Sequence, residues 1–540
     1  MTSPPAPSRL PTVSVAAIAW VLVVALFILL RVGLVWRAPV GGAELAHLSG
    51  AWQARIGVED DRYGPTLYQA VTALTLGWTE SEQPARAIAL AGALTIPLAL
   101  FMLRRRLGEG GALLALLLLA LDPAGIVLGV TATAAAWDAA IALWLVVALV
   151  AGRPPPWGWF LIAFLVATAG PLCLTVVLAA TVSAALHRHR PTRGALLWGA
   201  AGTALGVLLT SLQFGVDADG LRIAAFSLIA AGFDEPWSTL SVAELAALYG
   251  LPLLVGGAAA VVWLAVRLRD EGRSPTPMET LSLGVAGIAV VWFLVALPTH
   301  SPFPLAAATF ASCLLLGPAL ARLAGRLMAI TWRRESWLLL LALALAAIAC
   351  FVLSDWARQG HAGGAYERAL LVVAGIGAVT ALATLATYRE SLPLTLLAPV
   401  AIGGVLLLAG SSGIALSAAG EPLPGPTSPS SARAIRDVAL SANTSGGSIV
   451  VHERYREALT WPFRDSGTLL LASNLPAGAG VVIWPAGAPP PEGFVALDGR
   501  WVFEREIDGP DGFLGFAHWF AERNSLDQRL EIVAVYVRAP

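Results

Sequence analysis

The sequence predicts an all-α polytopic membrane bundle with a small α/β domain after it. Three observations lead to this prediction. Hydrophobic residues make up 57% of the chain and charged residues 13%, about half of the roughly 25% typical of soluble domains. Apolar runs of about 20 residues, long enough to cross a bilayer as helices, recur up to about residue 420. Beyond that point the pattern changes to short strands and helices of ordinary polarity.

The apolar runs divide residues 13–420 into about 13 predicted spans. They lie at about 13–36, 84–104, 111–130, 134–152, 157–171, 172–187, 194–214, 244–267, 280–298, 303–324, 336–354, 368–388 and 391–418. The short fifth and sixth runs meet at Gly170-Pro171 and can also form one broken helix. The Pro- and Ser-rich residues 1–12 are predicted to be disordered. Because Arg31 rather than a cleavage site follows the first run, we expect a retained helix rather than a signal peptide.

Arginine placement predicts how the bundle is oriented in the cell membrane. Four basic clusters fall on one side if the spans alternate, namely Arg104–Arg106, His187–Arg193, Arg267–Arg273 and Arg322–Arg334. Cytoplasmic loops are enriched in positive charge. We therefore expect a cytoplasmic N-terminus, with the first external loop (37–83) and the C-terminal domain on the extracytoplasmic side.

The C-terminal part of the chain is predicted to be a small α/β domain. A Pro/Ser-rich linker at 421–430 leads into residues 431–540. Strands are expected at 448–451, 480–484 and 530–537, and helices at 432–441 and 513–523.

Composition and motifs argue against several functional classes. The net charge of −1 provides no basic field for nucleic acid. The three cysteines, Cys173, Cys313 and Cys350, lie in apolar runs without metal-ligand spacing and are expected to be buried hydrophobes. Few charges lie at mid-span, and no paired interrupted helices indicate a transporter.

The external loop carries the first candidate site. Glu44 and His47 are three residues apart, so a helix would place both on one face. Leu45, Leu48 and Trp52 would then face the membrane. A carboxylate beside an imidazole can act as a general base or hold a divalent metal. The alternative is the solvated face of an amphipathic helix.

Asp138 is the second candidate, because it lies near the predicted external end of a span. A carboxylate placed there costs about 2.5–3.5 kcal/mol on insertion scales unless it has a partner. We therefore expect it to face a polar cavity. Asp122 is similar, but an Asp before Pro123 can simply cap a kink.

Eight short elements follow one another in an order that resembles one enzyme family. They read Ala43-Glu44-Leu45-Ala46-His47, Tyr63-Gly64-Pro65-Thr66-Leu67-Tyr68, Ala85-Arg86, Arg104 to Gly111, Leu121-Asp122-Pro123, the single Asp138, His300-Ser301-Pro302-Phe303 and Trp461-Pro462-Phe463-Arg464-Asp465. The chain thereby resembles GT-C superfamily membrane glycosyltransferases of the flippase-activity-associated and protein mannosyltransferase-like type. At four positions where members of that family carry a charged residue, this sequence has a different residue, namely Ala43, Thr133, Ala136 and His300.

The resemblance implies transfer of a sugar from a polyprenyl-phosphate-linked donor in the membrane lipid to a glycan, lipid or protein acceptor on the extracytoplasmic face. The family's usual base is an Asp at the position of Ala43. Our working hypothesis therefore makes Glu44 the base or a metal ligand, with Asp138 and His47 as its partners. Candidates for donor binding are Arg62, Tyr63, Tyr68, Arg86 and His300. The alternative is a catalytically degenerate GT-C-like accessory or scaffold protein in envelope glycan assembly.

Overall fold

The structure is a computed structural model of the 540-residue chain. It describes residues 14–35, 42–56, 67–76, 82–151, 156–168, 170–187, 192–211, 240–299, 301, 303–331, 405, 408, 431–444, 446–455, 459–464, 466, 469–472, 475–476, 478–507 and 528–539. The predicted spans at 336–354, 368–388 and 391–418 lie outside the described residues, apart from Val405 and Leu408.

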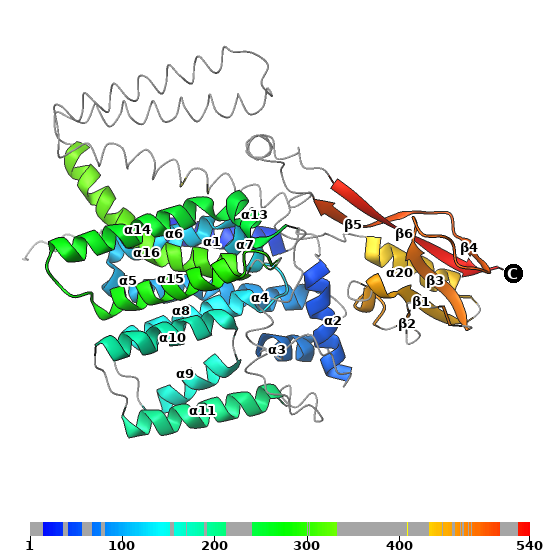
Figure 1. Ribbon diagram of the computed structural model, residues 1–540, viewed down its shortest axis with the longest axis horizontal. Helices are drawn as coiled ribbons and strands as arrows, with labels where there is room; N and C mark the ends of the chain where they lie inside the picture. Colours follow the sequence, from blue (N-terminus) through cyan, green and yellow to red (C-terminus); the bar gives the residue numbers. More distant parts are fainter. Residues whose placement is uncertain are drawn as a thin grey trace, which may run out of the picture.

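A bundle of apolar helices forms the larger part of the structure, and a small sheet domain lies at one end of it (Figure 1). The bundle helices are α1 (Val15–Val35), α4 (Gln83–Leu94), α5 (Ile96–Leu107), α6 (Glu109–Leu121), α7 (Pro123–Leu128), α8 (Ala135–Ala151), α9 (Pro156–Thr168), α10 (Pro171–Leu186), α11 (Arg193–Ser211), α13 (Val242–Leu245), the π-helix η2 (Ala246–Gly250), α14 (Leu251–Asp270), α15 (Pro277–Val295) and α16 (Phe303–Thr331). Among the described residues, five helical stretches are long and apolar enough to cross a membrane, and five shorter apolar helices accompany them. The predicted fold class is confirmed.

Proline positions explain where the predicted spans break. The span expected at 111–130 is divided into α6 and α7, because Asp122 adopts an extended conformation before Pro123 (φ −67°, ψ 112°). The runs on either side of Gly170-Pro171 are two helices with different neighbours. Helix α9 packs against α11, whereas α10 packs against α8 and α15. The alternative of one broken helix is therefore wrong.

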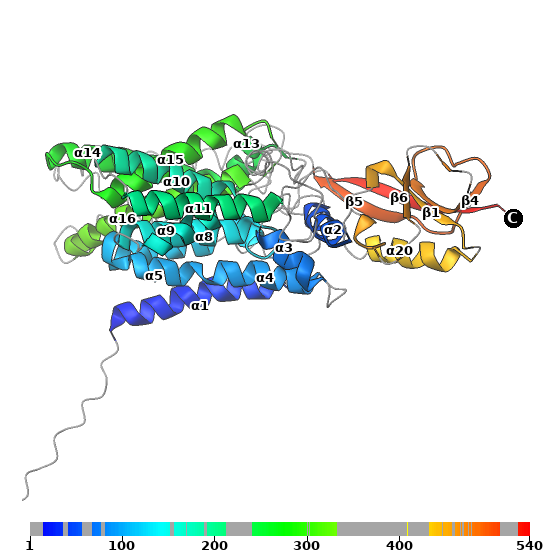
Figure 2. The same ribbon diagram turned by 90° about the horizontal axis from the view of Figure 1, so that it is seen from below.

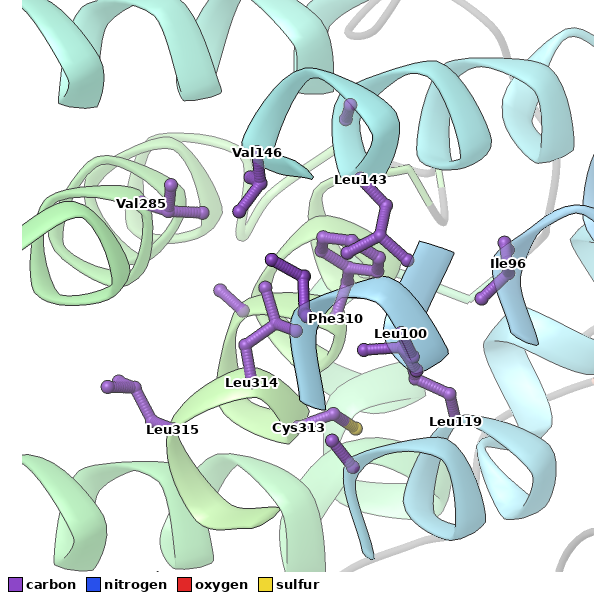
Figure 3. Packing of buried hydrophobic residues seen from close by; sticks show 14 of the residues in the cluster. Ile96, Leu100, Leu119, Leu143, Val146, Val285, Phe310, Cys313, Leu314 and Leu315 are labelled. Atoms are coloured by element: carbon purple, nitrogen blue, oxygen red, sulfur yellow. The ribbon is translucent and has the colours of Figure 1, made fainter. Parts of the chain in front are cut away.

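The bundle core is built around α16, which packs against α6, α14 and α15. Figure 3 shows Phe310 and Leu314 of α16 among side chains of α5, α6 and α8. Small residues allow this close approach. A Cβ on Gly317 would lie 2.5 Å from the carbonyl oxygen of Gly111, so α16 and α6 contact each other through their backbones.

The arginine-rich turns gather at one end of the bundle. His187 contacts the Thr280 hydroxyl at 3.1 Å, and the Arg322 guanidinium lies 5.2 Å from the Trp263 ring centroid. Arg273 pairs with Glu279 at 2.8 Å. Figure 2 shows α1 beginning at this end, whereas the sheet domain lies at the opposite end. This arrangement agrees with the predicted topology, and the cytoplasmic assignment of the arginine end stays a prediction.

The C-terminal domain is a mixed sheet packed on one helix. Its elements are α20 (Ser431–Ala442), β1 (Ser448–His452), β2 (Leu469–Ala472), β3 (Ala479–Pro485), β4 (Phe494–Ala496), β5 (Trp501–Ile507) and β6 (Gln528–Arg538). The strand order is β2-β1-β3-β6-β4, and β5 also pairs with β6. Pairs β1–β2 and β1–β3 are parallel, and all pairs with β6 are antiparallel. The expected helix at 513–523 lies outside the described residues.

Candidate active site

Helix α2 (Gly42–Ile56) lies between the bundle and the C-terminal domain (Figure 2). Its apolar residues Leu45 and Leu48 belong to the same buried cluster as Ile435 of α20. The Trp52 ring meets Trp461 edge to face, with 6.3 Å between centroids. The prediction that this face lies on the membrane is therefore wrong, because the C-terminal domain provides the apolar partner.

Glu44 and Arg86 form a buried, bidentate ion pair. The Arg86 Nε donates to Glu44 Oε1 at 2.6 Å, and its Nη2 donates to Oε2 at 2.7 Å. Both side chains are about 1% exposed. Two parallel N–H···O bonds to one carboxylate are the strongest form of arginine–carboxylate contact. The ion pair thus joins α2 in the external loop to the start of α4.

Backbone groups from two further segments complete this ion pair. Arg86 Nη1 donates to the carbonyl oxygen of Val35 at 3.0 Å, and the amide of Ala132 donates to Glu44 Oε1 at 3.0 Å. Val35 is the last residue of α1, and Ala132 precedes α8. The pair therefore ties together the ends of α1, α4 and α8 beneath α2.

Tyr68 lies next to this ion pair, on α3 (Leu67–Thr75). Its hydroxyl donates to the carbonyl oxygen of Ala85 at 3.0 Å, and its ring lies 6.4 Å from that of Trp137. Burial raises the pKa of Tyr68 well above its usual range. The hydroxyl therefore stays protonated at physiological pH and acts as a hydrogen-bond donor.

Asp138 caps helix α10. Its Oδ2 accepts from the Leu172 amide at 2.8 Å, and its Oδ1 accepts from the Cys173 amide at 3.1 Å. A carboxylate at a helix N-terminus satisfies free N–H groups and complements the helix dipole. Gly170 makes room for it, because a Cβ there would lie 2.6 Å from Asp138 Oδ2. The two amides at the start of α10 thus provide the hydrogen-bond partners that offset the free-energy cost of burying the Asp138 carboxylate.

A cavity of about 60 Å³ lies beside Asp138 inside the bundle. Its walls are mostly apolar, and Arg31, Asp122 and Asp138 are its charged lining residues. Arg31 Nη2 donates to the Leu119 carbonyl at 3.0 Å, and Thr309 donates to Asp122 Oδ2 at 2.9 Å. In the described part of the chain, Arg31 Nε and Asp122 Oδ1 have no partner. The cavity is large enough for water, which would satisfy both atoms.

Sequence reasoning did not select Arg31 or Asp122 as site residues. The signal that could have found them is the same one that selected Asp138. A charged side chain inside a span is costly and faces the bundle interior or a cavity. Arg31 stands four residues before the end of α1 and is 2% exposed.

Comparison with known proteins supports the fold. No protein-family model and no curated protein matches the chain. The crystal structure of ArnT from Cupriavidus metallidurans bound to undecaprenyl phosphate is similar, with a TM-score of 0.51 and 18% sequence identity over 86% of this chain and 93% of ArnT. ArnT in the apo state gives a TM-score of 0.48 at 18% identity, over 85% of this chain and 86% of that one. ArnT is a GT-C glycosyltransferase.

This chain shares the fold of ArnT. Its predicted site residues are distributed unevenly over the described part of that fold. Glu44 and Arg86 meet, and Tyr68 lies beside them. His47 is half-buried on α2. Arg62, Tyr63 and His300 lie outside the described residues.

The predicted metal pair of Glu44 and Asp138 does not fit the contacts that these two carboxylates make. Both Glu44 oxygens accept hydrogen bonds from Arg86, and the two Asp138 oxygens accept from the amides of Leu172 and Cys173. No group of three His, Cys, Asp or Glu side chains suited to a metal occurs among the described residues. Divalent cations need several oxygen or nitrogen ligands around one point. We therefore assign no step of the reaction to a metal held by this pair.

We expect Asp138→Ala to destabilise the helix bundle by about 1–3 kcal/mol, because two buried amides at the start of α10 lose their acceptor. The measurement is the thermal unfolding midpoint in detergent, followed by tryptophan fluorescence. Asp138→Asn should recover part of the loss, since its amide oxygen still accepts one bond. Asp437→Ala is the matched control, because that aspartate is 64% exposed. An unchanged midpoint in Asp138→Ala would contradict the capping role.

Proposed function

We propose that this protein is a membrane glycosyltransferase that moves a sugar from a polyprenyl-phosphate-linked donor to an acceptor on the extracytoplasmic face. The observation that carries the proposal is the GT-C likeness over most of the chain to ArnT bound to undecaprenyl phosphate. The buried pair of Glu44 and Arg86 supports it, because the pair provides a carboxylate and a guanidinium at the ends of several bundle helices.

The chemistry of sugar transfer assigns a role to each member of the pair. The acceptor hydroxyl must lose a proton as it attacks the anomeric carbon, and a carboxylate can take that proton. The departing phosphate gains negative charge, which a guanidinium stabilises through two parallel hydrogen bonds. Glu44 is the proposed base and Arg86 the proposed phosphate ligand. Tyr68 holds the backbone carbonyl beside Arg86.

The remaining predicted residues have supporting roles in this proposal. Asp138 anchors α10 and lines the cavity. His47 lies one turn after Glu44 on α2. Arg62, Tyr63 and His300 stay proposed donor ligands from the external loops. A metal is not required by any of these steps.

The test is a transfer assay on the purified protein in detergent or liposomes with radiolabelled polyprenyl-phosphate sugars. Wild-type protein should release sugar to an acceptor, and Glu44→Gln should lower the rate by about 10²-fold or more, since it cannot take a proton. Glu109→Gln is the matched control, because Glu109 is exposed at the opposite end of the bundle. Equal rates for wild type and Glu44→Gln would refute Glu44 as the base.

A degenerate accessory protein is the second candidate. The observation that favours it is that both oxygens of Glu44 already accept hydrogen bonds, from Arg86 and from the Ala132 amide, and neither is left to take a proton. Absence of turnover with every polyprenyl-phosphate sugar, combined with retained binding of the lipid phosphate, would support this second function.

A further inference from the structure

The Glu44–Arg86 pair presents a conflict for the proposed reaction. The proposed base and the proposed phosphate ligand are hydrogen-bonded to each other, with distances of 2.6 Å from Arg86 Nε to Glu44 Oε1 and 2.7 Å from Arg86 Nη2 to Glu44 Oε2. We infer that Arg86 exchanges partners: it pairs with Glu44 when the donor is absent and with the donor phosphate when it is present. This exchange rests on the proposed function. It would keep Glu44 from acting as a base until a donor is bound.

The geometry of the guanidinium permits the exchange. Arg86 uses Nε and Nη2, one edge of its planar fork, to hold both oxygens of Glu44. The same edge matches two oxygens of a phosphate. The donor phosphodiester carries one negative charge, as the carboxylate does, and the undecaprenyl phosphate released from it carries up to two.

Other contacts can hold both side chains in place during the exchange. Arg86 Nη1 donates to the Val35 carbonyl oxygen, whereas the bonds to Glu44 come from the other two nitrogens, Nε and Nη2. Glu44 Oε1 also accepts from the Ala132 amide. The carboxylate of the nearby Glu82 contacts Arg433 Nη2 through both of its oxygens. The exchange breaks the two hydrogen bonds that Arg86 shares with Glu44.

The position of the pair along the helices suits a lipid phosphate. Val35 is the last residue of α1, and Arg86 is the fourth residue of the Gln83–Leu107 helical stretch. Ends of spanning helices lie at the level of the lipid head groups. The phosphate of a polyprenyl carrier would therefore reach the depth of Arg86 while its chain remains in the hydrocarbon.

The exchange makes the reaction follow donor binding. After Arg86 moves to the phosphate, Glu44 takes the proton of the acceptor hydroxyl. The acceptor oxygen forms a bond to the anomeric carbon, and the bond from that carbon to the phosphate oxygen breaks. The electron pair of the broken bond leaves with the polyprenyl phosphate, which Arg86 holds. When this product departs, Glu44 releases its proton to solvent, and Arg86 returns to the carboxylate.

The test is the affinity of wild type and Glu44→Gln for undecaprenyl phosphate, measured in detergent by microscale thermophoresis. A neutral glutamine holds Arg86 less strongly, so less of the guanidinium is withheld from the phosphate. We expect Glu44→Gln to bind undecaprenyl phosphate about fivefold or more tightly than wild type, while losing transfer. Undecaprenol, which has no phosphate, should bind both proteins equally.

A labelling experiment on the wild type provides a second readout if Glu44→Gln fails to fold. A hydrophobic carbodiimide should modify Glu44 in the presence of undecaprenyl phosphate and not in the presence of undecaprenol, as detected by mass spectrometry. Equal or weaker phosphate binding by folded Glu44→Gln, or equal labelling with both lipids, would overturn the exchange alone. Failure of wild type and variant to bind undecaprenyl phosphate would overturn the proposed function with it.

Discussion

Replacing Arg86 by methionine is expected to destabilise the protein by about 3–5 kcal/mol, because it leaves the Glu44 carboxylate buried without its charged partner. Glu44 is 1% exposed, so water cannot take the place of the guanidinium. The thermal unfolding midpoint in detergent measures the loss. Arg105→Met is the matched control, since Arg105 is exposed at the arginine-rich end of the bundle.

The double variant Glu44→Gln with Arg86→Met separates the charge effect from packing. Its neutral glutamine keeps an acceptor for the Ala132 amide. Neutralising a buried charge after its partner is lost removes most of the penalty. The double variant should therefore unfold at a higher temperature than Arg86→Met alone. A double variant as unstable as the single one would show that Arg86 acts through packing rather than charge.

Replacing Trp461 by alanine is expected to cost about 3–5 kcal/mol, as for other buried tryptophans. Trp461 is 4% exposed and packs against Trp52 of α2, and the Arg464 guanidinium lies 4.0 Å from its ring centroid. Its removal leaves a hollow between α2 and the C-terminal domain. Limited proteolysis should then release the C-terminal domain faster, and the unfolding midpoint should fall.

Trp157→Ala is the control for this change, because Trp157 is 64% exposed on the surface of the bundle. It should leave the proteolysis rate of the C-terminal domain unchanged. Equal proteolysis of Trp461→Ala and wild type would mean that the second link to this domain, between Arg433 and Glu82, is sufficient to hold it.

The residue types of the site were visible in the sequence, but their pairing was not. Glu44 and Arg86 were both selected, as a base and as a phosphate ligand, and the structure joins them in one ion pair. They lie 42 residues apart, and no local pattern specifies a contact at that separation. The same limit applies to Asp138, whose partners are two amides of α10.

The orientation of α2 was predicted wrongly for a related reason. An apolar stripe shows that a helix face is buried, and a membrane and a protein domain can both bury it. Leu45 and Leu48 belong to one buried cluster with residues of the C-terminal domain, and Trp52 packs on Trp461 of that domain, which begins almost 400 residues later in the chain. Only the tertiary structure decides between the two partners.

The sequence by itself determined the membrane bundle, the C-terminal α/β domain and the common end of the arginine clusters. Those features follow from hydropathy, periodicity and charge, which are properties of short segments. The tertiary structure alone decided that Arg86 neutralises Glu44, that Asp138 caps α10, and that Arg31 and Asp122 share a cavity. These depend on which distant segments meet, because a buried charge takes whatever partner the packing of the helices brings to it.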